Sequence, residues 1–337
     1  MIIGIEFTWI LSLAIRKWWH KISTYAIVGG AGFIGSHFVD NLSKNGHRVI
    51  VIDNLCSGTL DRIASHVKNE HFQFINGEAS DTSLLVEAFK DVDTVIHLAS
   101  NPDIAAAMSN PRIDFQQGTI LSESVIEAVR ISGVKTILYA SGSGVYGEVA
   151  FKPIMETDQL LPVSPYGASK LAGEALLSAY AYMFDFRAIA FRFANVVGPR
   201  QTHGVGFDFL NKLMKNTGEL EILGDGTQSK SYIHINDIVS GVLHAENIST
   251  NFFEVYNIST PDFISVLDIA EIAVDVMGLN LKDVNFKFGT SDRGWKGDVP
   301  KILLSSEKLI STGWNSTLTS AEAIRASLKS MKLNLTK

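Results

Sequence analysis

Short apolar runs separated by longer amphipathic stretches dominate the chain from residue 24 to about residue 195. Within each run the apolar positions do not alternate with polar ones, which is typical of parallel strands covered on both faces. In the stretches between the runs, apolar residues such as Phe38 and Leu42 recur at helical spacing. The pattern predicts an α/β fold with a doubly wound parallel sheet. Its expected strands are residues 25–28, 49–52, 94–98, 136–140 and 187–191.

This rhythm changes after Asn195, where helix-like stretches and shorter strand candidates follow. The helices are expected at 207–214, 266–277 and near the C-terminus, and the strands at 221–223 and 232–235. We therefore expect a first domain over 24–195, to which a segment near 230–260 returns. A smaller mixed α/β domain would occupy mainly residues 196–330. Residues 1–23 would form an extension outside the fold.

Composition narrows the class of protein. The chain has 337 residues, 46% of them hydrophobic, and a formal net charge of -6, so a general affinity for nucleic acid is not expected. Cys56 is the only cysteine, which excludes an internal disulfide and a cysteine-based zinc site. The histidines show no metal-ligand spacing, so we expect no metal. These features favour an ordinary cytoplasmic enzyme.

The extension needs a separate interpretation. Residues 1–15 are largely apolar, which is shorter than the roughly 18 residues of a membrane-spanning helix, and a basic group with two tryptophans follows at 16–21. Such a group would suit a helix lying in a membrane interface. The simpler interpretation, which we favour, is an extension with no membrane partner.

A glycine-rich loop follows the first expected strand and opens a helix. Its sequence is Gly29-Gly-Ala-Gly32-Phe-Ile-Gly35, and Asp53 ends the next strand 24 residues after Gly29. Strand, glycine loop, helix and acidic residue in this order indicate a Rossmann dinucleotide site. The glycines allow close approach of a pyrophosphate, and the helix N-terminus offers free N–H groups. Asp53 would accept hydrogen bonds from ribose hydroxyls and repel a 2′-phosphate, which predicts NAD rather than NADP.

A tyrosine and a lysine four residues apart form the candidate catalytic pair. Ser164 is a plausible helix N-cap, and Pro165 suits the first helical position. Tyr166 then falls in the first turn, with Lys170 one turn further on the same face. The lysine and the positive helix end would lower the pKa of the phenol. Tyr166 is thus expected to act as an acid and base near neutral pH.

Residues 24 to about 330 resemble the extended short-chain dehydrogenase/reductases, an NAD-dependent epimerase/dehydratase family, and in particular its UDP-glucose 4-epimerase branch. Besides the glycine loop and the Tyr166–Lys170 segment, several motifs carry this resemblance. They are Asp53-Asn-Leu55, His97-Leu-Ala99, the stretches 140–147 and 192–199, Gly224-Asp-Gly-Thr227 and the stretch 293–298.

The resemblance implies a reaction on a nucleotide sugar. Tyr166 would remove the proton from the sugar's 4-hydroxyl while the C4 hydride passes to a tightly held NAD. The 4-keto sugar would turn over in the site and take the hydride back on its other face. Lys170 would hold the nicotinamide ribose, and a homodimer would form through the helices near 118–129 and after Tyr166.

The same resemblance implies two sets of binding residues. The cofactor would be bound by Gly29, Gly32, Phe33, Ile34, Gly35, Asp53, Asn54, Glu78, Leu98, Ala99, Tyr166 and Lys170. The substrate would be bound by Asn195, Lys230, Arg293 and Asp298. Two of these positions depart from the family: Glu78-Ala79 replaces an aspartate-led pair at the adenine contact, and Lys230 replaces an arginine.

The third departure lies in the mechanism. The family has a serine or threonine four residues before the tyrosine at position 146, and here that position is Gly142. In the family this hydroxyl hydrogen-bonds the reacting 4-oxygen. Ser141 or Ser143 would have to supply it, and we expect Ser143 to do so.

Other functions remain open at this point. A 4-keto-sugar reductase would use the same Tyr166–Lys170 pair, and another nucleotide-sugar epimerase would share the whole site. A 4,6-dehydratase is disfavoured, because the Asp-Glu pair typical of that branch is here Ser143-Gly144. From another class, an inactive NAD-binding regulatory protein is the alternative that Gly142 supports.

Overall fold

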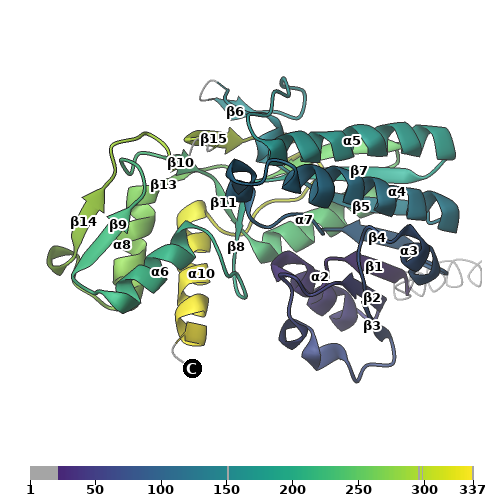
Figure 1. Ribbon diagram of the computed structural model, residues 1–337, viewed down its shortest axis with the longest axis horizontal. Helices are drawn as coiled ribbons and strands as arrows, with labels where there is room; N and C mark the ends of the chain where they lie inside the picture. The colour runs from purple at the N-terminus through teal and green to yellow at the C-terminus, as the bar shows by residue number, and fades with distance from the viewer. Residues whose placement is uncertain (1–21, 150–151, 295–296, 298, 336–337) are drawn as a thin grey trace, which may run out of the picture.

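The computed structural model describes residues 22–149, 152–294, 297 and 299–335. The expectations for residues 1–21 lie outside this range. Within it, the chain forms a large sheet with helices on both faces and a smaller region beside it (Figure 1).

A seven-stranded parallel sheet forms the large part, in the order β12-β7-β5-β4-β1-β2-β3. Its strands are β1 (Thr24–Val28), β2 (Arg48–Asp53), β3 (Phe72–Asn76), β4 (Thr94–His97), β5 (Thr136–Gly142), β7 (Arg187–Phe193) and β12 (Phe253–Ile258). The predicted doubly wound sheet is confirmed. The order reverses between β1 and β4, and in such sheets ligands bind at the carboxyl ends of the strands beside this point.

Helices cover both faces of the sheet. One face carries α3 (Thr82–Ala88), α4 (Leu121–Ser132) and α5 (Pro165–Phe184), and the other carries α2 (Phe33–Lys44) and α7 (Ile235–Ile248). Successive strand residues point to opposite faces, so Ile27 joins one buried apolar cluster and Val28 the other. The sheet is therefore packed against an apolar core on each face. Because residues pointing to either face are buried, the strands read as unbroken apolar runs in the sequence.

The smaller region has its own apolar core, built from α6 (Val205–Lys215), α8 (Val266–Met277) and α10 (Ser320–Leu335) with β9 (Glu219–Ile222) and β14 (Asn285–Phe288). A mixed sheet of β13 (Ile264–Ser265), β10 (Ser229–Lys230), β15 (Lys301–Leu304) and β6 (Pro153–Ile154) lies between this core and the large sheet. The chain passes between the two parts through β8 (Asn195–Val197) and β11 (Tyr232–His234), which pair in parallel. The short helix α9 (Glu307–Ile310) packs against β12.

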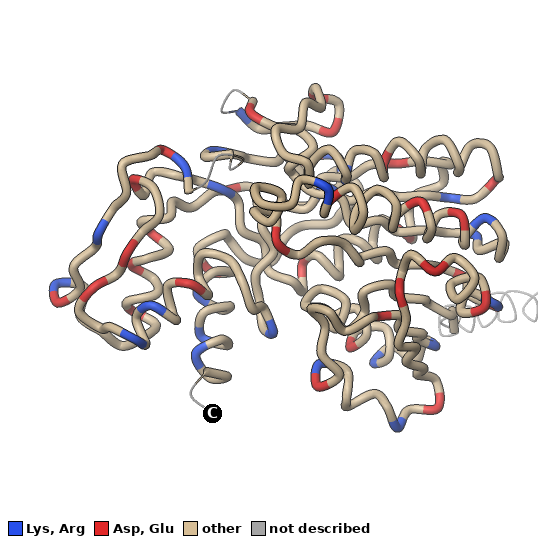
Figure 2. The backbone as a smooth tube through the Cα atoms, in the orientation of Figure 1, with Lys and Arg blue, Asp and Glu red and all other residues tan. Residues whose placement is uncertain are grey.

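The distribution of charged residues along the backbone agrees with the low net charge of the chain. Acidic and basic residues are interspersed along the backbone, with no continuous basic stripe among the described residues (Figure 2). None of the described helices is long and apolar enough to cross a membrane.

Candidate functional site

The glycine loop after β1 approaches neighbouring backbone too closely for any side chain. Gly29 has a φ of +86°, and a Cβ there would lie 2.8 Å from the backbone nitrogen of Ala99. A Cβ on Gly35 would lie 2.3 Å from the carbonyl oxygen of Gly29. The helix α2 that follows has no side-chain cap and no acidic residue in its first turn. Its N–H groups therefore suit the phosphates of a dinucleotide.

Asp53 lies on the other side of the glycine loop. We call the loop from Gly29 to Gly35 together with Asp53 the NAD cradle. Its side chain is 8% exposed, and its two carboxylate oxygens accept hydrogen bonds from the backbone nitrogens of Ala31 (2.9 Å) and Leu55 (2.8 Å). Next to it, the amide of Asn54 donates to the Glu78 carboxylate at 3.0 Å. The carboxylate of Asp53 is thus fixed at the end of β2, where a ribose would reach it.

The remaining predicted cofactor residues lie at the same edge. Leu98 and Ala99 directly follow β4, and both of their backbone nitrogens donate to the carbonyl oxygen of Val28 at the end of β1. Phe33 and Ile34 form the first turn of α2. The structure therefore brings the predicted dinucleotide residues together at the switch point between β1 and β4, and they fit such a cofactor.

The candidate catalytic pair, Tyr166 and Lys170, lies at the start of α5, the position that the sequence predicted. Ser164 caps this helix by accepting a hydrogen bond from the backbone nitrogen of Gly167 at 3.1 Å, and Pro165 is its first residue. Lys170 is 3% exposed; its Nζ donates to the carbonyl oxygen of Ala140 at 2.8 Å and lies 5.5 Å from the centre of the Tyr166 ring. The end of β5 thus holds the lysine beside the tyrosine.

The predicted direction of the Tyr166 pKa is wrong for the protein alone. Burial raises the pKa of Tyr166 to about 12, the Ser100 hydroxyl acts in the opposite direction, and the buried carboxylate of Asp114 raises it further. Burial also lowers the pKa of Lys170 to about 8, although Asp114 opposes that change. Desolvation by burial sets the direction of both shifts, and the attraction between lysine and phenolate that the sequence suggested is not among their causes.

The turn after β5 contains the missing hydroxyl and its candidate replacements. Gly142 has extended backbone, with a φ of -166°, and a Cβ at this position would meet no atom within 4 Å. Ser141 is buried and donates to the Glu174 carboxylate at 2.5 Å, so its hydroxyl is already engaged. Ser143 is half-buried in the 3₁₀ turn Ser143–Val145.

A buried ionic network below this turn was missed by the sequence analysis. Arg192 of β7 and Glu174 of α5, each 4% exposed at the side chain, form a salt bridge of 2.7 Å. Arg192 also donates to the Tyr146 hydroxyl (2.9 Å), which donates to Asn257 of β12 (2.7 Å). The network links β5, β7, β12 and α5. The sequence signal for this network is that Arg192 and Glu174 each lie among apolar residues, one in a strand and the other in a helix.

The predicted substrate residues lie toward the smaller region. Asn195 begins β8, Lys230 ends β10, and Asp298 lies outside the described residues. Arg293 does not point to an open phosphate site: it forms a 2.6 Å salt bridge with Glu148, just after the Tyr146 turn, and also contacts Asp292.

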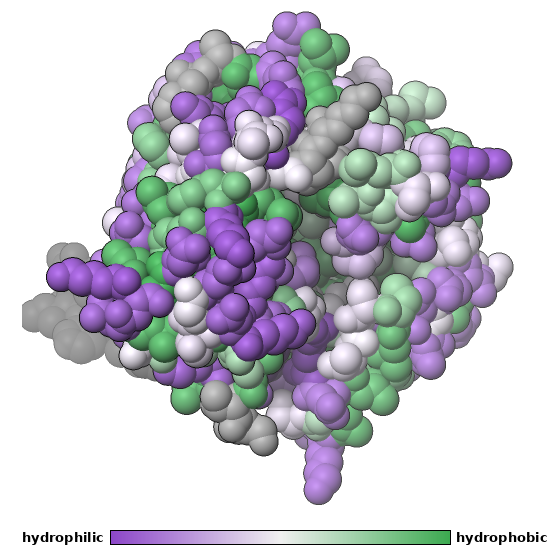
Figure 3. All heavy atoms as spheres, turned by 60° about the vertical axis from the view of Figure 1, so that its left-hand side comes forward, coloured by the Kyte–Doolittle hydropathy of each residue, from purple (hydrophilic) through white to green (hydrophobic). Residues whose placement is uncertain are grey.

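A pocket of about 320 Å³ lies where the segment after Tyr146 meets the smaller region. It is lined by Glu148, Val149, Thr227, Asp292, Val299, Pro300 and Lys301. In Figure 3, which brings the left-hand side of Figure 1 forward, the surface is hollowed near the centre of the view.

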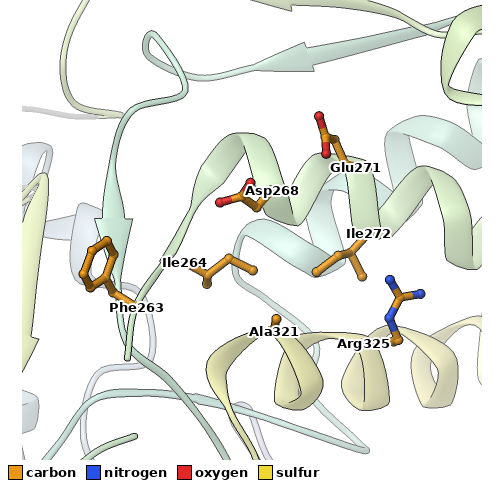
Figure 4. A pocket seen from close by; sticks show the side chains of 7 residues that line it. All are labelled: Phe263, Ile264, Asp268, Glu271, Ile272, Ala321 and Arg325. Carbon is orange, nitrogen blue, oxygen red and sulfur yellow. The ribbon is translucent and has the colours of Figure 1, made fainter. Parts of the chain in front are cut away.

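A second pocket, of about 430 Å³, is separate from all predicted site residues (Figure 4). It lies between α8 and α10, where Arg325 pairs with Asp275. Its lining is Phe263, Ile264, Asp268, Glu271, Ile272, Ala321 and Arg325. In the described part of the chain, no group of three or more metal-ligating side chains occurs.

Comparison with known proteins decides the family. The model of the NAD dependent epimerase/dehydratase family matches residues 25–259, which include both the glycine loop and the Tyr166–Lys170 pair. The chain belongs to this family. A UDP-glucose 4-epimerase of Mycolicibacterium smegmatis is 32% identical over 226 residues, which cover 65% of this chain and 72% of that protein.

Solved structures of the family superimpose over nearly the whole chain. A crystal structure of a UDP-galactose 4-epimerase is 36% identical with a TM-score of 0.83, covering 93% of this chain and 99% of that one. The UDP-glucose 4-epimerase of Thermus thermophilus in complex with NAD is 27% identical with a TM-score of 0.81, covering 92% and 99%. The predicted cofactor, NAD, is therefore confirmed.

Proposed function

We propose that the protein is an NAD-dependent nucleotide-sugar epimerase that interconverts UDP-glucose and UDP-galactose at C4. The observation that carries the proposal is the position of Tyr166 and Lys170 on α5, at the same sheet edge as the NAD cradle of Gly29, Gly35 and Asp53. The similarity to UDP-glucose and UDP-galactose 4-epimerases over most of the chain supports the sugar and the nucleotide.

The cradle residues would hold the cofactor in distinct ways. The loop from Gly29 to Gly35 and the first turn of α2 would bind the pyrophosphate, and Asp53 would accept the ribose hydroxyls. Asn54 and Glu78 lie next to Asp53, on the adenosine side. When bound, NAD supplies the acceptor for the C4 hydrogen and a positive ring charge that favours the Tyr166 phenolate.

Tyr166 would take the proton from the sugar's 4-hydroxyl and return it after the sugar has turned. With a pKa raised to about 12 by burial, the free phenol keeps its proton at neutral pH. Proton removal therefore requires positive charge nearby, and the Lys170 ammonium, held by the Ala140 carbonyl, is in place to supply it.

The smaller region would hold the nucleotide diphosphate while the sugar rotates. Asn195, Lys230, Arg293 and Asp298 are the residues we assign to this task. Arg293 would exchange the Glu148 carboxylate for a phosphate, because both are anions that its guanidinium can bind in the same way.

The test is conversion of UDP-galactose by the purified protein with no cofactor added, with UDP-glucose measured by chromatography. We expect conversion, because each turnover restores the oxidised cofactor. The Tyr166→Phe variant should lose about 10²- to 10⁴-fold in kcat. Tyr182→Phe is the matched control, since Tyr182 is an exposed tyrosine on the same helix.

Failure to convert either UDP-hexose, with NAD binding verified, would refute the proposed substrate. Conversion of another UDP-sugar instead would retain an epimerase and replace the sugar. Net oxidation or reduction of the cofactor in step with the sugar would indicate a reductase or dehydrogenase.

A further inference from the structure

Lys170 is a buried cation with little hydrogen bonding. It is 3% exposed, and in the described part of the chain its Nζ has a single acceptor, the carbonyl oxygen of Ala140 at 2.8 Å. An ammonium group carries three N–H donors, and burial disfavours its charged form. Contacts other than hydrogen bonds therefore bear on whether this charge is kept beside Tyr166.

Two tyrosine rings lie against the ammonium. The Nζ of Lys170 lies over the ring of Tyr139, 5.3 Å from its centre, and over the ring of Tyr166, 5.5 Å from its centre. Both distances are within the range of about 6 Å for a cation–π interaction, in which the negative face of the ring attracts the cation. This attraction is strongest where water is excluded. Tyr139 thus adds an attractive contact on the ammonium besides the Ala140 carbonyl.

The Tyr139 ring is fixed in this position by its neighbours. It is 1% exposed and belongs to β5, one residue before Ala140. At its hydroxyl end it packs against α5: a Cβ on Gly173 would lie 2.4 Å from the Tyr139 hydroxyl oxygen, so glycine leaves the room that the tyrosine occupies. The His97 ring lies 5.3 Å from the Tyr139 ring, centre to centre. The ring therefore has little freedom to move away from Lys170.

Two further ionisable groups act on or respond to the ammonium. Burial, followed by the charge of Lys170, lowers the pKa of His97 to about 3, so His97 is neutral at neutral pH. The buried Asp114 carboxylate favours the charged form of Lys170 and so raises its pKa. Neither side chain is removed when Tyr139 is replaced, so the effect of the ring can be measured by itself.

We propose that Tyr139 is a positioning residue: the face of its ring, together with the Ala140 carbonyl, holds the Lys170 ammonium beside Tyr166. The inference rests on the proposed function, in which this ammonium supplies the positive charge for proton removal by Tyr166. Because Tyr139 is buried, it acts through Lys170 and not on the substrate. The aromatic ring is the part that this role requires, and the hydroxyl is not.

The first test measures the pKa of Lys170 itself, by NMR of the purified full-length protein labelled with ¹³C at the lysine ε-carbon. The Lys170 signal is identified by its absence in Lys170→Met. Tyr139→Leu should lower this pKa by about one pH unit, because the charged form loses an attractive contact, and Tyr139→Phe should change it by less than about 0.3 pH units. An equal decrease in both variants, or no decrease in Tyr139→Leu, would overturn the proposal.

The second test separates positioning from stability. Near neutral pH, Tyr139→Leu should lower kcat for UDP-galactose about tenfold with KM changed less than about threefold, and its activity should fall at a pH about one unit lower. The control is Phe89→Leu, since Phe89 is fully buried in the same apolar core, at the end of α3. This control should lower the midpoint of thermal unfolding while kcat and the Lys170 pKa stay unchanged. A loss of kcat in Phe89→Leu as large as in Tyr139→Leu would contradict a specific role of the Tyr139 ring.

Together the tests separate a wrong role of Tyr139 from a wrong substrate. A lowered Lys170 pKa in Tyr139→Leu, in a protein that converts no UDP-hexose, would support the ring contact and refute the substrate. Conversion of UDP-galactose with an unchanged Lys170 pKa in Tyr139→Leu would retain the epimerase and refute the role of Tyr139.

Discussion

Burial sets the direction of the pKa shifts of the two candidate catalytic side chains, Tyr166 and Lys170. The sequence could predict the spacing of Tyr166 and Lys170 and the Ser164 cap, because these depend on residues within one helical turn. It could not predict the direction of the Tyr166 pKa, since that depends on packing against distant segments such as the one that carries Asp114.

The lowered pKa of Lys170 predicts a pH dependence of stability in the cofactor-free protein. The folded pKa is about 8 and the unfolded value 10.5, so between these pH values only the unfolded chain carries this proton. Stability should therefore rise with pH across this window, by up to about 3 kcal/mol from this group. Urea unfolding from pH 7 to pH 10 measures it, as the difference between the protein and Lys170→Met. A difference that stays constant with pH would contradict the assigned burial of the ammonium.

Central strands were easier to predict than edge strands. The five strands predicted for the large sheet are β1, β2, β4, β5 and β7, which are covered on both faces and carry nearly continuous apolar runs. The two strands predicted after Asn195 correspond to β9 and β11. β3 and β12 were missed because they lie at the two edges of the sheet and mix polar with apolar residues, as in Phe72–Asn76. Helix α8, in contrast, has the predicted bounds, since its capping box and its final glycine are local signals.

The junction of β1 and α2 is the element on which cofactor binding depends. In Gly35→Ala the new methyl group would collide with the backbone of Gly29 and Gly30, and α2 would have to move away from β1. We expect a loss of about 1–3 kcal/mol in unfolding free energy and loss of NAD from the purified protein. Thermal unfolding and the nucleotide content after denaturation measure both effects. Gly218→Ala is the control, because its Cβ would make only an ordinary contact at 3.6 Å; equal behaviour of the two variants would contradict this account.

At the scale of the whole molecule, the sequence predicted two unequal parts, and the structure shows how they are linked. β12 returns to the edge of the large sheet beside β7, while β6 leaves the large part and pairs with β15. Such exchanges pair residues far apart in the sequence, so local patterns could not reveal them. The Glu148–Arg293 salt bridge crosses the same junction, at the pocket between the two parts.

This salt bridge should compete with nucleotide binding. Because Arg293 must leave Glu148 to bind a diphosphate, Glu148→Gln should tighten the binding of UDP. A partly exposed ion pair contributes at most about 1 kcal/mol, so we expect a decrease of about two- to fivefold in Kd. Isothermal titration calorimetry measures it, with Glu70→Gln as a control of equal charge change at an exposed carboxylate. Unchanged or weaker binding in Glu148→Gln would show that Arg293 does not hold the diphosphate.

The central claim is reversible oxidation at C4 of a UDP-hexose, and an isotope measurement tests it most directly. UDP-galactose deuterated at C4 is incubated with the protein in ordinary water, and the UDP-glucose formed is analysed by mass spectrometry and NMR. We predict that the product keeps its deuterium at C4, because the same hydrogen leaves and returns within the closed site while only the hydroxyl proton passes through Tyr166. Loss of the deuterium to solvent, or its retention only in unconverted UDP-galactose, would contradict this account.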